Sequence, residues 1–216
     1  MIKKIILLFA VLLITGCTNL ENQMKDTENA IFALNKKNTG KVIALYPDKE
    51  KIKTYGTLVN GRIHGKYFEF YENGSQLLVL NYNNGKQNGP AEKYYPNGNI
   101  EIEGTMKNDL ADGKFTFFYE DGTRQSVKNF KQGVYNGWYT EYYPNGNIKS
   151  KGNYTDGYKN GNFFFYNEEG KKIQEGKYLN GLRYGIWKNF NSTGKVISTV
   201  DYKDTGYINP ETKISL

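Results

Sequence analysis

Residues Gly133–Gly146 read GVYNGWYTEYYPNG, and this stretch decides the fold because close copies of it recur along the chain. Gly157–Gly170 (GYKNGNFFFYNEEG) has the same spacing of glycine and aromatic residues. Laid out at a period of 24 residues, six consecutive units fill residues 58–201 without insertion or deletion. Self-similarity at a fixed period of this kind is the signature of a repeat protein.

Glycine and aromatic residues keep fixed positions within each unit. One glycine column comprises Gly74, Gly98, Gly122, Gly146, Gly170 and Gly194. A wholly aromatic column comprises Phe70, Tyr94, Phe118, Tyr142, Tyr166 and Phe190. Three residues before it stand Tyr67, Ala91, Phe115, Tyr139, Phe163 and Trp187. This recurrence predicts that all six units share one fold, whose turns need the glycines of the first column.

Each unit is predicted to be a β-hairpin. In the first unit a run that ends in aromatic residues, Lys66–Tyr71, precedes a turn at Glu72–Ser75. Asn-Gly or Asp-Gly recurs at this turn, as in Asn97-Gly98, and favours a tight turn with positive φ at both central residues. A second run follows, for example Asn147–Asn153. Helices are not expected, because no apolar period of 3.6 residues is sustained.

Two packing predictions follow from the columns. Gly104, Gly152 and Gly176 fall inside the second strand, where glycine indicates a bulge or an aromatic ring lying over bare backbone. The column that begins at Phe70 is expected to form a ladder of neighbouring rings across the sheet. The predicted fold class is therefore all-β: an elongated antiparallel meander of repeated 24-residue hairpins in a single-layer twisted sheet.

The residue pattern of Gly133–Gly146 and Gly157–Gly170 resembles the MORN repeat, in the bacterial variant form of the YwqK-type antitoxin-labelled family. The resemblance covers residues 58–202 well and residues 34–57, a degenerate first repeat, weakly. It implies a binding scaffold without a catalytic site. Some positions depart from the pattern and imply looser turns or a looser ladder: Ala91, Asp109, Asn167 and Asn191.

The N-terminus is predicted to be an export signal. Residues 1–16 carry Lys3 and Lys4 before an apolar run of ten residues, which is too short to span a bilayer and is typical of a signal peptide. The following Cys17 completes a segment, Ile14–Cys17, that resembles the bacterial lipoprotein lipobox. The resemblance implies cleavage after Gly16 and a lipid on Cys17, which anchors the chain to the cell envelope. Thr18 rather than Asp after the cysteine implies the outer membrane in a cell with two membranes.

The remaining boundaries follow from composition. Residues 17–33 comprise the lipidated cysteine and a polar tether without apolar periodicity. Residues 202–216 comprise a truncated repeat and a C-terminal tail.

Composition excludes several classes of activity. The chain of 216 residues has one Cys and one His, so a disulfide framework, a zinc cage and a histidine-clustered metal site are excluded. Glu69 and Glu141 share a column with Lys93 and Asn189, so no column supplies paired catalytic carboxylates. We therefore expect no enzyme, no metal and no cofactor. The net charge of +7 is spread along the repeats, and nucleic acid is not expected as a partner of an exported protein.

The expected function is a protein-interaction scaffold at the envelope, with two alternatives left open. One is an antitoxin or immunity-like protein that binds a toxin; the other is a binder of cell-wall glycan or anionic polymer. In each case the exposed aromatic rows would contact the partner. The candidate binding residues are Tyr67, Tyr71, Tyr95, Trp138, Tyr139, Tyr143 and Trp187.

Overall fold

The computed structural model of the protein describes residues 30–34, 39–47 and 50–202, and these residues contain strands and turns but no helix. The predicted signal peptide, Cys17, most of the tether and the tail after Tyr202 lie outside the described residues. Accordingly, no helix long and apolar enough to cross a membrane is found in the part of the chain that is described.

The chain divides into two compact units, residues 1–111 and residues 112–216. Strands of the first unit are β1 (Ala30–Leu34), β2 (Gly40–Leu45), β3 (Ile52–Val59), β4 (Arg62–Ile63), β5 (Gly65–Phe70), β6 (Gln76–Asn83), β7 (Lys86–Gln87), β8 (Gly89–Tyr94), β9 (Ile100–Lys107) and β10 (Leu110–Ala111). Strands of the second unit are β11 (Gly113–Phe118), β12 (Arg124–Lys131), β13 (Val134–Tyr142), β14 (Ile148–Thr155), β15 (Tyr158–Lys159), β16 (Gly161–Tyr166), β17 (Lys172–Leu179), β18 (Leu182–Phe190) and β19 (Val196–Tyr202).

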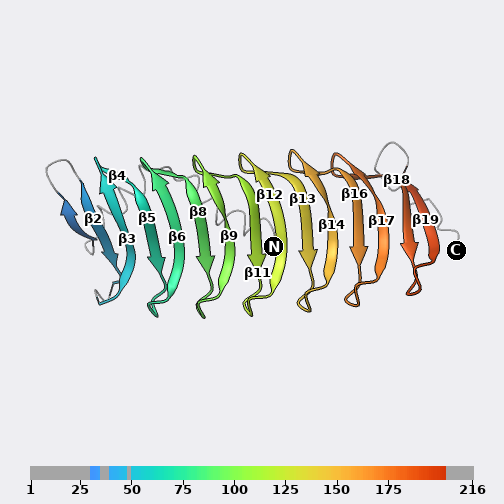
Figure 1. Ribbon diagram of the computed structural model, residues 1–216, viewed down its shortest axis with the longest axis horizontal. Coiled ribbons are helices and arrows are strands. Elements are labelled where there is room, and N and C mark those ends of the chain that lie inside the picture. The colour runs from blue at the N-terminus through green and yellow to red at the C-terminus, as the bar shows by residue number, and fades with distance from the viewer. Residues whose placement is uncertain (1–29, 35–38, 48–49, 203–216) are drawn as a thin grey trace. The chain divides into compact units, whose positions relative to one another are not determined.

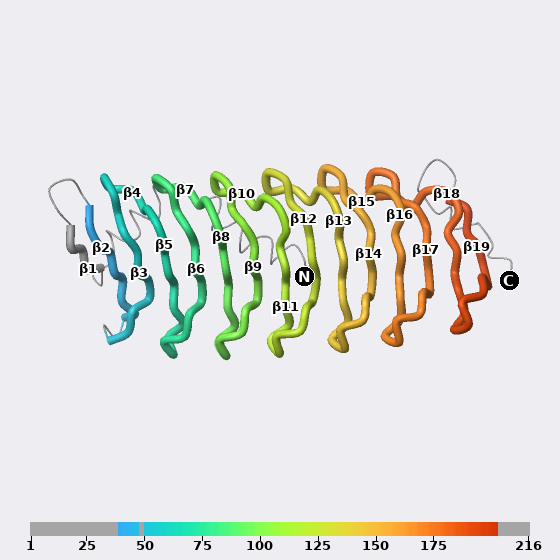
Figure 2. The backbone as a smooth tube through the Cα atoms, in the orientation of Figure 1, coloured from blue at the N-terminus to red at the C-terminus, as the bar shows by residue number. Residues whose placement is uncertain are grey.

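Within each unit the strands follow one another as an antiparallel meander (Figure 1). In the second unit β12 pairs with β11 and β13, β14 with β13 and β16, and β18 with β17 and β19. The first unit has the same arrangement, for example β5 between β3 and β6. The backbone trace repeats the same bent hairpin along each unit (Figure 2). The predicted all-β fold of repeated antiparallel hairpins is confirmed.

Two-residue turns join β3 to β4, β6 to β7, β9 to β10, β12 to β13, β14 to β15 and β17 to β18. At Asn60-Gly61 both residues have positive φ, 52° and 76°, and Val59 pairs with Arg62 across the turn. This is the type I′ geometry that suits the twist of a hairpin. The other turns with positive φ at both positions are Asn84-Gly85, Asn108-Asp109, Gln132-Gly133, Asp156-Gly157 and Asn180-Gly181.

The predicted geometry of the other turn is wrong. At Asn97-Gly98 and its equivalents only the glycine has positive φ, for example 89° at Gly98. Gly74 illustrates the bonding: its N–H donates to the Tyr71 carbonyl at 2.9 Å, and the Tyr71 N–H donates to the Ser75 carbonyl at 2.8 Å. This is a three-residue loop with one left-handed glycine at its end. An Asn-Gly pair is compatible with both geometries. Here the Asn73 side chain accepts the Ser75 N–H at 2.9 Å, and the Asn73 backbone stays outside the left-handed region.

One side of each unit, which we call the core face, carries the buried side chains. Side chains alternate between faces along a strand, so Tyr67 and Leu80 lie on the core face of the first unit, and Phe163 and Trp187 on that of the second. Each of these four side chains is at most 2% exposed. The opposite side, the open face, carries Phe68 in the first unit and Phe164, Lys177 and Ile186 in the second.

The aromatic ladder is present, but other columns build it. In the second unit edge-to-face contacts join Phe163 to Tyr178 at 4.9 Å and Tyr178 to Trp187 at 5.0 Å between ring centroids. These rings belong to the column of Tyr67 and to the first position of each unit, not to the wholly aromatic column as predicted. The reason is a register shift in each hairpin, as between Phe165 and Tyr166, next to the wholly aromatic column. Tyr166 lies instead under the Lys151 ammonium group, 5.6 Å from its ring centroid.

Glycines inside the long strands make room for these rings. A Cβ atom on Gly152 would lie 2.6 Å from the Phe163 ring, and one on Gly176 would lie 2.2 Å from Trp187. The aromatic ring over bare backbone is therefore confirmed at these two positions. At Gly176 the pairing with β18 also shifts in register, so the alternative of a bulge is confirmed there as well. Where the repeat of residues 58–81 meets that of residues 82–105, Leu80 takes the glycine position and Ala91 the ring position, and both are buried, at 2% and 1% exposure. A large and a small residue have exchanged places there, so the expected loosening at Ala91 does not occur.

Hydrogen bonds between successive hairpins hold the repeat spacing. The hydroxyl of Tyr71 donates to the Tyr94 carbonyl at 2.7 Å, and that of Tyr143 donates to the Tyr166 carbonyl at 2.9 Å. At the type I′ turns the second residue donates its N–H to the preceding repeat, as Gly157 does to Tyr135 at 2.9 Å. Asp109 keeps this bond, to Gln87, and its carboxylate also accepts the Gln87 N–H at 2.7 Å. The expected loosening at Asp109 is therefore not seen.

Candidate protein-interaction surface

The open face of the second unit exposes an unusual number of large apolar side chains. Among the described residues, Trp138 is 67% exposed, Tyr158 61% and Ile186 60%. The register of the neighbouring pairs places further exposed apolar residues on the same face. They are Val134, Leu179, Leu182 and Tyr184. Exposed apolar residues gathered on one face are a mark of an interaction site, whereas isolated ones need no explanation.

The equivalent positions in the first unit are mostly polar. Leu182 corresponds to Arg62 and Lys86, and Ile186 corresponds to Lys66, all at multiples of the 24-residue period. Leu110 is an exception, since it occupies the Leu182 position in the first unit and is 41% exposed. Residues of the core-face columns keep the same type from repeat to repeat, because every hairpin needs them to fold. The open-face columns change between repeats, so the fold does not dictate their chemistry.

The structure places the seven predicted binding residues in three environments. Trp138 alone lies exposed on the open face. Tyr71, Tyr95, Tyr139 and Tyr143 are half-buried; the hydroxyls of Tyr71 and Tyr143 bond to the next repeat, and that of Tyr139 bonds to Glu141 at 3.0 Å. The prediction that Tyr67 and Trp187 form part of an exposed row is wrong, because each is 1% exposed in the core face.

Sequence reasoning missed most of the exposed apolar surface, including Tyr158, Leu182 and Ile186. The predicted binding residues come from recurring aromatic columns, but recurrence in this fold marks packing. The useful signal was the opposite one: columns that vary between repeats and change from basic residues such as Arg62 and Lys66 to apolar ones.

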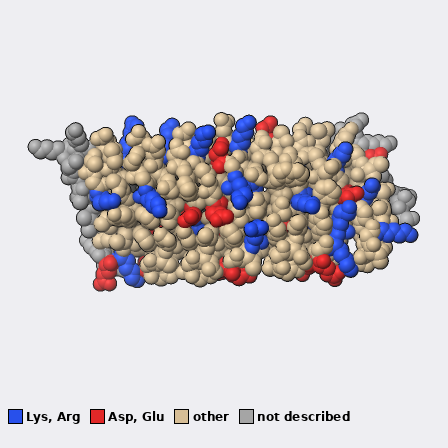
Figure 3. Space-filling view, in the orientation of Figure 1, with Lys and Arg blue, Asp and Glu red and all other residues tan. Residues whose placement is uncertain are grey.

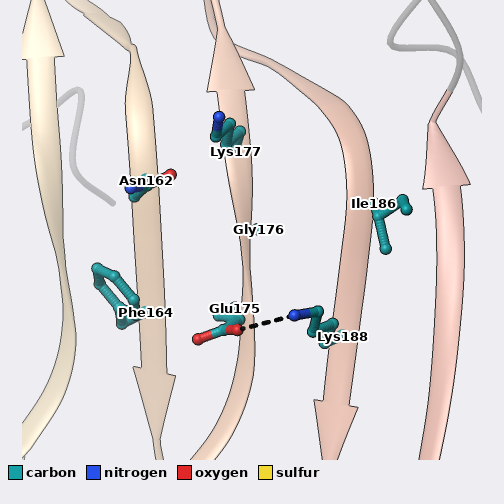
Figure 4. Close-up of a pocket in the computed structure, with 7 residues that line it drawn as sticks. All are labelled: Asn162, Phe164, Glu175, Gly176, Lys177, Ile186 and Lys188. Atoms are coloured by element: carbon teal, nitrogen blue, oxygen red, sulfur yellow. Dashed lines mark ion pairs between the residues drawn. The ribbon is translucent and has the colours of Figure 1, made fainter. Parts of the chain in front are cut away.

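A hollow of about 210 Å³ lies on the open face of β16, β17 and β18. Figure 4 shows its arrangement: Asn162 and Phe164 on β16 form one side, Ile186 and Lys188 on β18 form the other, and Gly176 lies on β17 between them. Lys177 and Glu175 stand on either side of Gly176 along the same strand. The floor is bare backbone because the missing side chain of Gly176 would point to the core face, where Trp187 occupies the space.

The charges around this hollow are unequal. Glu175 contacts two lysines, with its carboxylate 2.7 Å from the Lys172 ammonium and 3.8 Å from that of Lys188. None of the ion pairs among the described residues involves Lys177. The ammonium groups of Lys151 and Lys172 lie over the Phe164 ring, at 5.7 Å and 6.0 Å from its centroid. The hollow therefore combines apolar walls with a local excess of positive charge.

On the side of the molecule seen in Figure 3, basic and acidic side chains are scattered among uncharged ones in both units. The view shows no continuous basic stripe of the kind that follows a nucleic-acid backbone.

Carboxylates on the core face are engaged in structural bonds. Burial raises the pKa of Glu69, and a hydrogen bond from the Tyr67 hydroxyl at 3.2 Å opposes the shift. Burial also acts to raise the pKa of Glu141, but bonds donated by Lys149, Tyr139 and Ser150 outweigh it, and that pKa lies below its ordinary value. Among the described residues no group of three or more His, Cys, Asp or Glu side chains is placed to hold a metal ion.

Fold and surface together define a class: a β-hairpin repeat protein that packs one face of its sheet and exposes a variable other face. The sequence model of the family described as MORN repeat variant matches residues 87–108, 111–132, 135–156 and 183–204. The chain is therefore a MORN-repeat protein of this variant type. The starts of the matches keep the 24-residue register, and residues 159–180, between the last two, form the same hairpin from β15, β16 and β17. A search of curated protein sequences gives no match.

Proposed function

We propose that this chain is a non-enzymatic scaffold that binds another protein through the open face of residues 112–202. The main support is the contrast between repeats: the same structural positions hold Arg62 and Lys66 in the first unit but Leu182 and Ile186 in the second. Nothing in the packing of the hairpin requires this change. Apolar side chains exposed on a repeat surface favour a protein partner, because such a partner can cover them.

At the hollow on β16–β18 the glycan alternative has less support than a protein partner. Binding of sugar rings uses uncovered aromatic faces, but the Phe164 ring beside the hollow already carries two lysine ammonium groups. The antitoxin alternative is one form of the protein-binding proposal, with a toxin as the partner. It predicts that the bound protein is toxic when this chain is absent.

We also propose that the scaffold is exported and held at the cell envelope by a lipid on Cys17. The support is the sequence of residues 1–17, in which a basic start, a short apolar run and the single cysteine coincide. Two or more acyl chains provide stable anchoring, whereas one does not. The proposed scaffold would thus hold its partner close to a membrane surface.

Site-specific photocrosslinking in living cells tests the protein-binding proposal. A benzoylphenylalanine residue is introduced in place of Ile186, and in a second strain in place of Lys66, the equivalent position of the first unit. The proposal predicts a discrete crosslinked protein from position 186 and none from position 66. Crosslinks of equal yield from both positions, crosslinks to polysaccharide alone, or no crosslink at position 186 would contradict it.

A further inference from the structure

The hollow on β16–β18 has the chemistry to select the partner. Resting on the proposed scaffold function, we propose that the hollow receives one large apolar or aromatic side chain of the partner protein, and that a carboxylate next to that side chain pairs with Lys177. The partner segment is therefore an acidic one with an apolar anchor. Phe164 and Ile186 support the apolar anchor, and Lys177 supports the neighbouring carboxylate.

The size and walls of the hollow fit a single ring. Cavities of about 150 Å³ lined by apolar side chains hold one benzene molecule, and this hollow measures about 210 Å³. Phe164 and Ile186 form apolar walls on opposite sides, and Ile186 is 60% exposed. Neighbouring strands lie about 4.8 Å apart, so walls on β16 and β18 stand roughly 10 Å apart. That spacing admits one side chain between them.

Charge complementarity specifies what lies beside the anchor. The single carboxylate that lines the hollow, Glu175, is already held by Lys172 and Lys188. Lys177 has no ion-pair partner among the described residues and stands beside the bare floor at Gly176 (Figure 4). The carboxylate of Asp201, opposite Ile186 on β19, lies outside the residues that line the hollow. An acidic group on the partner would thus meet an unpaired ammonium, whereas a basic segment would meet repulsion.

A glycan is the less suitable occupant of this particular site. Its ring would need the face of Phe164, over which Lys151 and Lys172 lie. It would also leave Lys177 without a negative partner.

The proposal is tested with defined peptides and the full-length chain in lipid nanodiscs. The probes are three pentapeptides with blocked ends: Gly-Glu-Phe-Glu-Gly, the same peptide with Ala for Phe, and the same peptide with Lys for both Glu. Binding is followed by the chemical shifts of the Ile186 methyl group and the Gly176 amide. The expected result is saturable shifts with the first peptide, and binding weaker by about fivefold or more for each of the other two.

Two variants of the protein distinguish the effect of the lysine charge at the hollow from the effect of a lysine charge elsewhere on the surface. Lys177→Glu should weaken the Gly-Glu-Phe-Glu-Gly peptide by about fivefold or more. The matched control is Lys66→Glu, an exposed lysine on the open face of β5 in the first unit, which should leave binding unchanged. Equal binding of the three peptides, equal effects of the two variants, or shifts confined to other residues would overturn the proposal. Larger shifts at Ile186 and Gly176 with a chitin oligosaccharide than with the acidic peptide would overturn it as well.

The two proposals fail separately. If a protein crosslinks at position 186 in cells and its recovery is unchanged by Lys177→Glu, the scaffold function stands and the acidic-anchor proposal fails. If no protein crosslinks at position 186, the scaffold function itself fails.

Discussion

Gly176→Ala isolates the close contact between backbone and ring on which the repeat core depends. The added Cβ would lie 2.2 Å from the Trp187 ring, so either the ring or the strand must move. Trp187 has little freedom to do so. Its ring lies 5.0 Å from Tyr178 and 4.1 Å from the Arg183 guanidinium, and its indole N–H donates to the Lys177 carbonyl at 3.1 Å.

The cost follows from these contacts. Losing the indole hydrogen bond costs about 1 kcal/mol, and disturbing a ring pair costs about 0.5–1.5 kcal/mol. Overpacking of a close-packed core typically costs about 1–3 kcal/mol. We therefore expect Gly176→Ala to lower the free energy of unfolding by about 2–3 kcal/mol, which for a chain of this size is a fall in Tm of roughly 4–12 °C.

The assay is urea unfolding followed by Trp187 fluorescence in a Trp138→Phe background, which removes the other tryptophan. The control is Gly146→Ala, where φ is +85° and no atom lies within 4 Å of the added Cβ. That variant carries backbone strain without a clash and should lose only about 1 kcal/mol. A rescue variant combines Gly176→Leu with Trp187→Ala, which copies the Leu80 and Ala91 arrangement; because it lacks Trp187, its unfolding is followed by circular dichroism. A loss below about 0.5 kcal/mol for Gly176→Ala, or a loss smaller than that of Gly146→Ala, would refute the reasoning.

Four further outcomes are expected. Gln132, at φ 50°, stands where the other type I′ turns have Asn or Asp, so Gln132→Asn should raise the free energy of unfolding by up to about 1 kcal/mol in urea titration; a loss of stability would contradict the turn assignment. Tyr143→Phe removes the bond to the Tyr166 carbonyl and should cost about 1 kcal/mol, whereas the exposed Tyr158→Phe should change thermal stability by less than about half of that. The pKa of Glu69 is raised by burial, so its stabilising contribution is present at low pH and lost as pH rises through the folded-state pKa; the pKa of Glu141 is lowered, so its contribution is present at neutral pH and lost as pH falls through the folded-state pKa. Glu69→Gln should therefore raise Tm at pH 7 and Glu141→Gln should lower it, and melting curves that shift in the same direction would contradict the opposite signs. Finally, Cys17→Ser should release the chain from the membrane fraction of cells; retention there would show that another segment anchors it.

The hairpin fold could be predicted because its determinants repeat. Each column presents the same residue type up to six times, so the positions of the turns at Gly74 and its equivalents follow from local chemistry, and the glycine at position 176 predicts either a bulge or a ring over bare backbone. Two details could not be obtained this way. Asn-Gly suits two turn geometries, and only the backbone shows that the type I′ turns lie at Asn60-Gly61 and its equivalents. The register shift before Tyr166 likewise decides which aromatic column forms the ladder.

The candidate surface was harder to predict for a physical reason. Aromatic residues that recur in a thin sheet are the ones that it buries, as Tyr67 and Trp187 illustrate at 1% exposure each. A residue chosen for binding has no need to recur, so Leu182 and Ile186 carry no signal within their own unit. They stand out only against Arg62 and Lys66 at the same positions elsewhere in the chain.

The central claim is that the open face of the second unit, and not that of the first, holds a protein partner. The partner protein is first identified by its crosslink at position 186. The most direct test then measures how much of this partner co-purifies, without crosslinking, with each of two matched double variants. Leu182→Asp with Ile186→Asp charges the second unit, and Arg62→Asp with Lys66→Asp charges the equivalent positions of the first. The account predicts that the first pair lowers recovery by roughly thirtyfold or more while the second pair leaves it unchanged. Equal recovery with both pairs, or a greater loss with the second, would contradict it.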